Sequence, residues 1–258
     1  MSKAELVVIT GGAEGLGLSL ARQFLADGSQ VLITSRDPAK LESARIGLAQ
    51  MGQVLTCKLD LLDGQSVDLF CDFVLSRMFT SLVLVNNAAR GFVGPALSAT
   101  DDEVQSILTA DFAAHVKIIR RFWPRLREGG GLINILSVLA IRPIPDWGLY
   151  SAAKAAFANF CVALQSEFRR DRVSVLNVYP GKINTRFTEK SGGDENKKAR
   201  NEPGGISPDA LAKQIHRRFR SRPNGQLYTP ISVHAIYLLH ALSATFTSRL
   251  LELLVARK

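Results

Sequence analysis

Two side chains that could exchange a proton stand one helical turn apart in the segment YSAAK, residues 150–154. Residues four apart on an α-helix lie on the same face, so Tyr150 and Lys154 can point into one cleft. A free phenol has a pKa of about 10, which is too high for ready proton exchange at neutral pH. A nearby ammonium group favours the phenolate and lowers that pKa. The pair therefore has the residue types of a general acid or base and of the cation that activates it.

YSAAK alone leaves two interpretations open, because tyrosine and lysine are also common on exposed helix surfaces. Ser137 favours the chemical one. It ends the apolar segment GLINILS, upstream of the pair, and its hydroxyl could donate a hydrogen bond to an oxygen on which charge develops.

A glycine-rich turn, TGGAEGLG at residues 10–17, lies near the start of the chain. Gly11, Gly15 and Gly17 allow positive φ angles and let a diphosphate approach the backbone without a Cβ in the way. The helix that begins near Gly15 offers free N–H groups and the positive end of its dipole to that anion. Three glycines could form a simple turn, but their place between a strand and a helix favours nucleotide binding.

The elements that position these groups follow a strand–helix alternation. Apolar segments without polar alternation are typical of parallel strands that are covered on both faces. They occur at 6–10, 30–35, 54–60, 82–87, 131–137 and 173–179. Helical periodicity lies between them, at 15–27, 38–51, 64–78, 102–127 and 148–170. The pattern predicts an α/β fold in which residues 1–258 form one domain, a doubly wound parallel sheet of the Rossmann type.

Two regions depart from this alternation. Residues 186–206 are polar, glycine-rich and charged, which predicts a mobile loop with room for a short helix. Residues 229–258 become apolar again and predict a C-terminal extension of two helices.

Six motifs in the expected order resemble the short-chain dehydrogenase/reductase family. Besides the glycine turn, Ser137 and the Tyr-Lys pair, they are Asp60 in KLDL, NNAA at 86–89 and YPGKINT at 179–185. Ala89 stands where the family pattern has glycine. The resemblance covers roughly residues 5–185 and fades toward the C-terminus. It implies the fold that the alternation also predicts.

The resemblance also implies the cofactor, the mechanism and the site. Tyr150 would donate a proton to a carbonyl oxygen while reduced nicotinamide delivers hydride, Lys154 would hold the nicotinamide ribose, and Ser137 would bind the same oxygen. The implied cofactor-binding residues are Gly11, Gly15, Leu16, Gly17, Ser35, Arg36, Asp60, Leu61, Asn87, Ala88, Tyr150, Lys154, Pro180, Gly181, Ile183 and Thr185.

The end of the second predicted strand indicates which nucleotide binds. NAD-preferring relatives carry an acidic residue there, but here Ser35 is followed by Arg36. A hydroxyl and a guanidinium can both donate hydrogen bonds to a 2′-phosphate, so we predict NADP(H). Asp37 taking the acidic role is the alternative, and Glu14 in the glycine turn also argues against a phosphate.

One departure from the family pattern concerns charge. Aligning ILTADFAAHV with the helix after the fourth strand puts Asp111 where relatives have an asparagine that holds a water linked to the lysine. A negative charge there would stabilise Lys154 and oppose the Tyr150 phenolate. We therefore expect an active enzyme with a rate optimum at higher pH than that of an asparagine variant. A shifted alignment would make Asp111 an ordinary helix residue.

The predicted substrate wall is apolar, which suits a hydrophobic ketone, aldehyde or secondary alcohol. Core packing explains any single member equally well. Residues 186–206 would close over the substrate as a lid. The wall residues are Phe92, Leu139, Pro145, Trp147 and Phe187.

The composition limits the classes of protein to which the chain can belong. An apolar share of 47% with 21% charged residues predicts a packed globular protein, and a net charge of +9 favours anionic ligands. Basic clusters at 118–127 and 215–223 lack a nucleic-acid-binding signature, so we interpret them as solvated helix faces. Three separated cysteines predict neither disulfides nor a metal site, and the absence of a signal segment predicts a cytoplasmic protein.

Competing functions stay open at this point. We expect a homodimer or homotetramer packed through the C-terminal helices, with peripheral contact to a lipid surface as the alternative for those helices. A non-catalytic nucleotide sensor of the same fold, supported by Asp111, competes with the oxidoreductase. The short chain and the glycine spacing argue against an epimerase or dehydratase.

Overall fold

Seven parallel strands form the central sheet. The structure is a computed structural model that describes residues 5–168, 170–171, 173–199 and 204–230. The strands run in the order β3-β2-β1-β4-β6-β7-β9. Their bounds are β1 Leu6–Ile9, β2 Gln30–Ser35, β3 Val54–Lys58, β4 Leu82–Asn86, β6 Gly131–Ile135, β7 Ser174–Pro180 and β9 Gly225–Thr229. The predicted doubly wound parallel sheet is confirmed, and the strand order reverses between β1 and β4.

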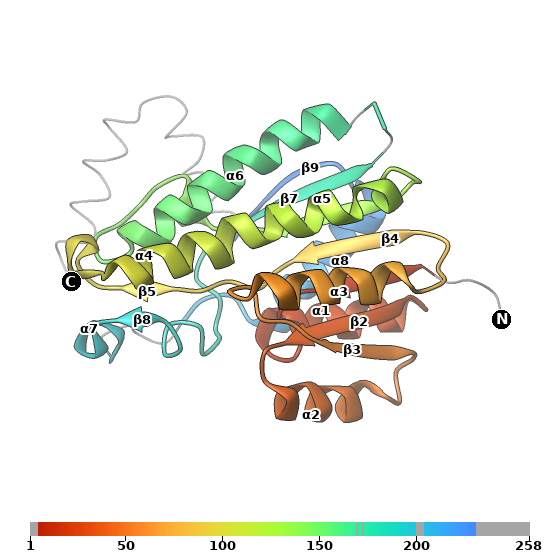
Figure 1. Cartoon of the computed structure of the whole chain (residues 1–258), viewed down its shortest axis with the longest axis horizontal. Helices are drawn as coiled ribbons and strands as arrows, with labels where there is room; N and C mark the ends of the chain where they lie inside the picture. The colour runs from red at the N-terminus through yellow and green to blue at the C-terminus, as the bar shows by residue number, and fades with distance from the viewer. Residues whose placement is uncertain (1–4, 169, 172, 200–203, 231–258) are drawn as a thin grey trace.

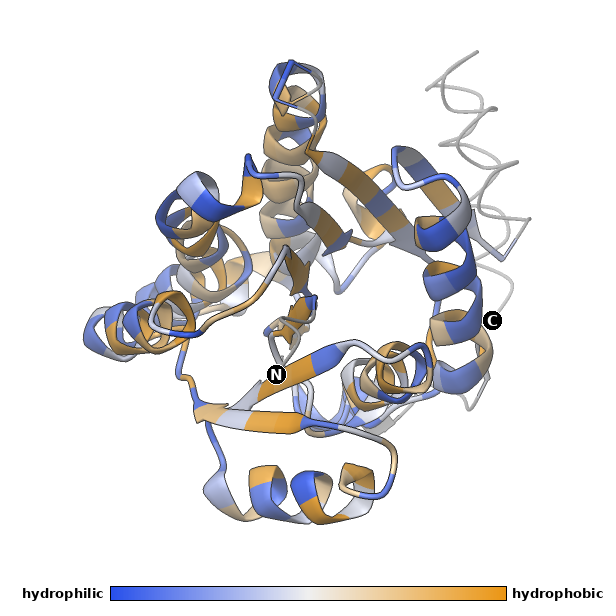
Figure 2. Ribbon diagram, turned by 90° about the vertical axis from the view of Figure 1, so that its right-hand side faces the viewer, coloured by the Kyte–Doolittle hydropathy of each residue, from blue (hydrophilic) through white to orange (hydrophobic). Residues whose placement is uncertain are grey.

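Helices cover both faces of this sheet (Figure 1). One face packs against α1 (Gly15–Ala26), α2 (Pro38–Leu48) and α8 (Pro208–Ser221). The other packs against α3 (Gly64–Leu75), α5 (Ala114–Leu126) and α6 (Gly148–Phe168). Both faces of the sheet are therefore buried, which explains why its central strands are apolar throughout. The hydropathy view shows apolar strands between helices that carry hydrophilic residues on their outer sides (Figure 2).

Strand β9 and helix α8 are among the elements that the sequence did not predict. Strand β9 is short and only partly buried at the sheet edge, so its sequence GQLYT carries no continuous apolar run. Helix α8 appeared only as part of a basic cluster, because few of its residues are apolar. Four of them form its buried stripe: Leu211, Ala212, Ile215 and Phe219.

The helix predicted over 102–127 is interrupted. It consists of α4 (Asp101–Leu108), a π-helical turn η2 (Thr109–Ala113) and α5. A π-turn inserts one extra residue into the helical repeat and so changes which side chains face inward. Apolar periodicity continues across the turn, which is why the sequence predicts one unbroken helix.

The segment at 186–206 is tied to the loop after β4. A small parallel ribbon pairs β5 (Phe92–Val93) with β8 (Gly192–Gly193), and α7 (Glu195–Ala199) follows. The Gly192 N–H donates to the Gly91 carbonyl at 2.9 Å. Lys197 also pairs with Asp146 in the loop before α6. The role of this segment as a lid stays a prediction, and the C-terminal helices predicted within 231–258 lie outside the described residues.

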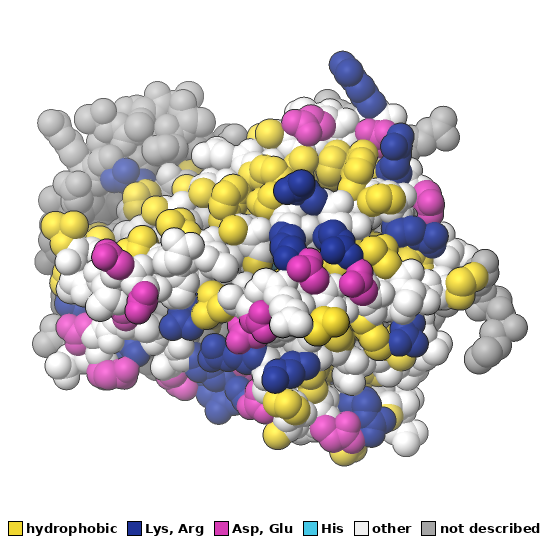
Figure 3. All heavy atoms as spheres, viewed as in Figure 1, with side chains coloured by type: hydrophobic (Ala, Val, Ile, Leu, Met, Phe, Trp, Pro, Cys, Tyr) yellow, Lys and Arg dark blue, Asp and Glu magenta, His cyan; other side chains and the backbone are white. Residues whose placement is uncertain are grey.

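The surface carries both signs of charge. On the face covered by α3 and α5, Lys117 and Arg121 pair with Asp68 and Asp72, and basic and acidic side chains lie beside one another there (Figure 3). In the described ranges no helix is both long and apolar enough to cross a bilayer. The cysteines Cys57, Cys71 and Cys161 are free thiols.

Candidate active site

A cavity of about 800 Å³ lies at the carboxyl ends of the central strands. In open α/β sheets, ligands bind at this edge where the strand order reverses. The cavity brings together residues from predicted motifs spread from the first strand to β7. The predicted site residues that line it are Gly11, Gly15, Leu16, Ser35, Arg36, Asp60, Leu61, Asn87, Ala88, Ser137, Leu139, Trp147, Tyr150, Lys154, Pro180, Gly181, Ile183, Thr185 and Phe187.

Four predicted site residues do not line this cavity. Phe92 is 2% exposed and packs with Ile107 and Ala153 in a separate small core, so its ring serves packing. Pro145 is exposed, and its neighbours Ile144 and Trp147 face the cavity in its place. Gly17 and Asp111 lie one layer behind the cavity wall.

The glycine turn is shaped for close backbone contact. Gly11 has φ +64° and Gly15 has φ +54°, a left-handed conformation that glycine adopts without strain. A Cβ on Gly17 would lie 2.3 Å from the Gly11 carbonyl oxygen, so only glycine fits beneath the turn. The Gly11 N–H donates to the Thr34 hydroxyl at 3.2 Å, which ties the turn to the end of β2.

Thr10 and Asn87 join the glycine turn to the NNAA segment. The Thr10 hydroxyl accepts hydrogen bonds from the N–H groups of Asn87 at 2.9 Å and Ala88 at 3.0 Å. The Asn87 side chain donates to the carbonyl of Thr10 at 2.9 Å and to that of Gly11 at 3.2 Å. These bonds fix the floor of the cavity. The sequence predicted cofactor contact for Asn87 but not its bonds to the turn.

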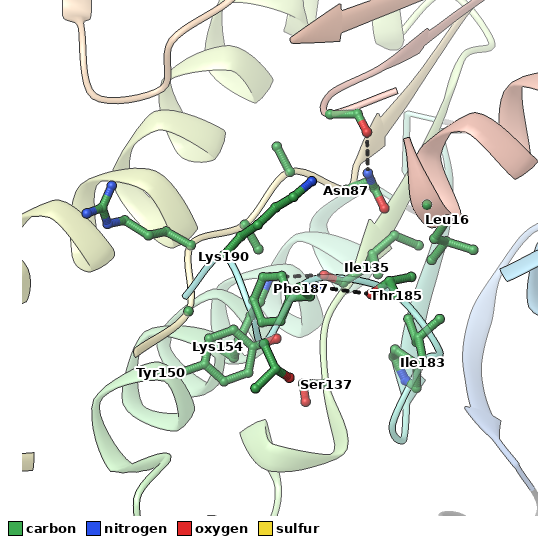
Figure 4. A pocket seen from close by; sticks show the side chains of 18 of the residues that line it. Leu16, Asn87, Ile135, Ser137, Tyr150, Lys154, Ile183, Thr185, Phe187 and Lys190 are labelled. Carbon is green, nitrogen blue, oxygen red and sulfur yellow. Dashed lines mark hydrogen bonds between the residues drawn. The ribbon is translucent and has the colours of Figure 1, made fainter. Parts of the chain in front are cut away.

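Tyr150 lies between two aromatic side chains of the predicted substrate wall. Its ring centroid is 5.6 Å from that of Trp147 and 5.6 Å from that of Phe187. Figure 4 shows Tyr150, Lys154 and Ser137 grouped on one side of the cavity, with Leu16 and Asn87 on the other. The hydroxyl of Ser137 also accepts a hydrogen bond from the Leu139 N–H at 3.1 Å, which fixes its orientation.

Lys154 and Asp111 form a buried ion pair behind Tyr150. Their side chains are 2% and 0% exposed, and Lys154 Nζ lies 3.7 Å from Asp111 Oδ2. Lys154 also donates to the Ile135 carbonyl at 3.2 Å, and Asp111 Oδ1 accepts from the Arg90 N–H at 2.6 Å. Burial raises the pKa of Asp111 to about 6, although Lys154 and the Arg90 N–H act in the opposite direction.

The structure corrects the predicted effect on the tyrosine. In this structure the pKa of Tyr150 is raised above its ordinary value, not lowered. Burial is the largest cause, the Asp111 carboxylate adds to it, and a hydrogen bond with Ser137 opposes both. The Lys154 ammonium lies 5.8 Å from the centre of the tyrosine ring, and the adjacent carboxylate offsets its charge.

Two further residues belong to the site. The sequence motifs did not indicate His115, and Glu14 entered only as an argument against a bound phosphate. The Glu14 carboxylate pairs with Lys190, with Lys40 at 3.5 Å and with Arg186 at 3.6 Å, so cations from two other segments surround it. His115 is 1% exposed, and its Nε2 lies 2.9 Å from the Ala88 carbonyl. No motif marks His115; its position one turn after Asp111 was the available signal.

The residues that line the cavity are suited to bind a dinucleotide. The glycine turn and the start of α1 present a close backbone surface to a diphosphate, and Thr185 lies 3.3 Å from where a Gly15 Cβ would be. Ile183 and Tyr150 line the same cavity farther along, where a nicotinamide ring would lie.

Comparison with known proteins identifies the family. The sequence matches the profile of the short chain dehydrogenase family over residues 5–196. The chain is a short-chain dehydrogenase. The oxidoreductase class of its activity follows from this membership, as does the use of a nicotinamide nucleotide.

Curated relatives are similar over most of this short-chain dehydrogenase. A dehydrogenase/reductase SDR family protein 7-like of Anopheles gambiae is 29% identical over 251 residues, which is 93% of this chain and 79% of the relative. A 3-ketodihydrosphingosine reductase of Bacteroides thetaiotaomicron is 30% identical over 187 residues, which is 72% of this chain and 66% of the relative. This chain spans only 32% of the probable oxidoreductase EphD of Mycobacterium tuberculosis.

Solved structures share the fold. An alcohol dehydrogenase from Thermococcus sibiricus, complexed with 5-hydroxy-NADP, is 25% identical with a TM-score of 0.77, covering 87% of this chain and 95% of that one. The L-sorbose reductase of Gluconobacter frateurii, complexed with NADPH and L-sorbose, is 26% identical with a TM-score of 0.75, covering 88% and 94%. A Burkholderia phymatum protein in complex with NAD has the same fold, with a TM-score of 0.84 at 19% identity and 95% coverage of each chain.

Proposed function

We propose that this short-chain dehydrogenase interconverts a ketone or aldehyde and an alcohol with NADP(H), acting on a hydrophobic substrate. One observation carries the proposal: a single cavity is lined by the glycine turn at one end and by Ser137, Tyr150 and Lys154 at the other. A nucleotide held by the turn would therefore reach the residues that can move a proton.

The chain's own residues would divide the work as follows. Tyr150 would donate its phenol proton to the carbonyl oxygen and take one back from an alcohol in reverse. Ser137 would donate a hydrogen bond to that oxygen as it gains charge. Lys154, which is held by Ile135 and Asp111, would bind the nicotinamide ribose. Bound NADPH would supply the hydride.

Charge around the cavity supports NADP(H) over NAD(H). Six cationic and two acidic side chains line it, and Asp111, which pairs with Lys154 behind the wall, reduces the formal surplus to three positive charges. NADPH carries about four negative charges, two of them on the 2′-phosphate, and NADH carries about two. The cations are Arg36, Arg90, Lys154, Lys182, Arg186 and Lys190, and the acids are Glu14 and Asp60.

The end of β2 supports the same choice. Ser35 and Arg36 line the cavity, whereas Asp37 does not. The Asp37 carboxylate instead caps α2, where it accepts hydrogen bonds from the N–H groups of Ala39 at 3.0 Å and Lys40 at 3.2 Å. Asp37 is therefore engaged elsewhere and is poorly suited to bind the ribose hydroxyls of NAD.

The substrate side of the cavity supports a lipophilic carbonyl compound. Leu139, Ile144, Trp147 and Phe187 surround Tyr150 with apolar surface. The formal charge of the lining is already matched by NADPH, which favours a substrate that is uncharged near its carbonyl group. Similar proteins that are named as a 3-ketodihydrosphingosine reductase and an L-sorbose reductase support carbonyl reduction as the reaction.

Incubation with NADPH and a panel of lipophilic ketones and aldehydes tests the proposal. We expect loss of nicotinamide absorbance with at least one substrate, and weaker turnover with NADH. Binding of NADPH without turnover of any carbonyl or alcohol would favour the non-catalytic sensor. Homodimer or homotetramer formation stays a prediction that sedimentation analysis would test, and a cytoplasmic location also stays a prediction. Flotation with anionic vesicles would test the alternative, contact of the C-terminal helices with a lipid surface.

A further inference from the structure

Three ionisable side chains are buried around Tyr150. Asp111, His115 and Lys154 are 0%, 1% and 2% exposed. Asp111 Oδ2 has no hydrogen-bond partner among the described residues, and its closest charged neighbour is Lys154 Nζ at 3.7 Å. A buried charge is stable only when it is paired, so Lys154 is the group that keeps Asp111 ionised beside the reacting tyrosine.

The π-turn brings Asp111 to this position. Asp111 is the third residue of Thr109–Ala113, where the helix between α4 and α5 is locally widened. Its Oδ1 is fixed by the Arg90 N–H at 2.6 Å, which leaves Oδ2 free to face Lys154. π-turns are frequent at functional sites, since they reorient one side chain without ending the helix.

The Arg90 side chain also favours the Asp111 carboxylate, more weakly than Lys154 does, and the other described groups that face the pair are uncharged. Burial and Lys154 lower the pKa of His115 to about 4, so its ring is neutral at neutral pH and is held at Ala88. Burial raises the pKa of the Cys161 thiol, which therefore stays protonated. Ser137 contributes only a hydrogen bond to Tyr150. The charge state near the phenol is thus set by Asp111 and Lys154.

With Asp111 ionised, the Asp111–Lys154 pair is already neutral. Removing the Tyr150 proton would then leave an uncompensated negative charge in a buried site. With asparagine at position 111, the phenolate would instead be balanced by Lys154. The carboxylate and the phenolate therefore compete for one ammonium group.

We infer that Asp111 sets the pH range of this site: it holds Tyr150 in the phenol form across the neutral range, so that the phenolate that oxidises an alcohol forms only at strongly alkaline pH. The inference rests on the proposed function. In the reductive direction the carbonyl carbon gains a hydride from NADPH, its oxygen gains the Tyr150 proton, and the phenolate recovers a proton from solvent. Asp111 is a positioning residue here, because it acts through Lys154 and Tyr150.

A titration that does not depend on turnover tests the inference. Ionisation of Tyr150 is followed by tyrosinate absorbance, as the difference between each protein and the same protein carrying Tyr150→Phe, which removes the other three tyrosines from the signal. In the wild type we expect ionisation above the ordinary phenol value of about 10. Asp111→Asn should lower the midpoint by about one to two pH units, since one nearby like charge is removed.

Two features of the design keep this test decisive. Asparagine retains an oxygen that can accept the Arg90 N–H, and Asp102→Asn removes an exposed carboxylate from α4 as a matched control. Asp102→Asn should leave the midpoint unchanged. Equal midpoints in wild type and Asp111→Asn, or a wild-type midpoint below about 10, would overturn the inference. The second outcome needs no variant at position 111 to fold.

The maximal rates supply the second measurement. At a fixed mildly alkaline pH, Asp111→Asn should oxidise an alcohol about 10- to 100-fold faster than wild type, because the phenolate population rises with the shifted midpoint. An unchanged oxidation rate would overturn the inference. Absence of turnover in both directions for every substrate tested would overturn the proposed function instead, while the titration would still report on Asp111.

Discussion

Adding a single methyl group at Gly17 should damage nucleotide binding. A Cβ there would lie 2.3 Å from the Gly11 carbonyl oxygen, 2.8 Å from Asn87 Nδ2 and 2.9 Å from Gly12 Cα. Relieving the closest contact to 3.0 Å requires a shift of 0.7 Å in the turn. The Asn87 side chain cannot simply move aside, because it already bonds the carbonyls of Thr10 and Gly11.

The size of the effect follows from this displacement. Overpacking of a well-packed site costs about 1–3 kcal/mol. The displaced groups are those that would meet the diphosphate, so the affinity of Gly17→Ala for NADPH should fall about 5- to 150-fold. Its free energy of unfolding should fall by about 1–3 kcal/mol as well.

Gly47→Ala provides the matched control. Gly47 lies in α2, and a Cβ there would have no atom within 4 Å. The same substitution should raise the free energy of unfolding by up to about 1 kcal/mol, since alanine is the better helix former. NADPH affinity is measured by calorimetry and stability by urea unfolding. Wild-type affinity and stability in Gly17→Ala would refute the reasoning about the turn.

Three further predictions concern the nucleotide, the substrate and pH. Arg36→Ala should weaken NADPH binding about 10- to 100-fold and leave NADH binding unchanged in fluorescence titrations, because one charge-assisted hydrogen bond to the 2′-phosphate is lost. Trp147→Ala should lower kcat/KM for lipophilic ketones more than for small ones, since apolar contact beside Tyr150 is removed. Burial raises the pKa of Asp111 to about 6 in the folded protein, above its value of about 4 in the unfolded chain. The protonated carboxyl therefore contributes stability that is complete below about pH 4 and is lost as the pH rises through 6. Urea unfolding should therefore show Asp111→Asn gaining up to about 3 kcal/mol relative to wild type between those pH values, and a constant difference would contradict the burial argument.

The motifs predicted the floor and the far end of the cavity because their spacing is tied to parallel strands. Each of Gly11, Asn87, Ser137 and Pro180 follows a strand or ends one, and the carboxyl ends of parallel strands meet at one edge. Residues that are far apart in the sequence can therefore be assigned to one site from their positions at the ends of the strands. Six of the strands and their parallel arrangement were predicted from the same alternation.

The substrate wall could not be predicted residue by residue. Phe92 lies in the two-residue strand β5 and Pro145 in the loop before α6, and the direction of such side chains depends on packing that no local pattern encodes. The β5–β8 ribbon holds Phe92 away from the cavity. This ribbon pairs two segments that lie about a hundred residues apart in the sequence. Tyr150 shows the same limit for electrostatics: YSAAK predicts a lowered pKa, but burial raises the pKa of Tyr150, and the carboxylate that the π-turn brings to the lysine adds to this rise.

Single-turnover kinetics of Tyr150→Phe test the central claim most directly. The ring stays between Trp147 and Phe187, so the variant should bind NADPH with unchanged affinity. With the phenol proton removed, hydride transfer from bound NADPH to a ketone should slow by at least about 100-fold. A variant that binds NADPH and reduces the ketone at the wild-type rate would contradict the assignment of Tyr150 as the proton donor.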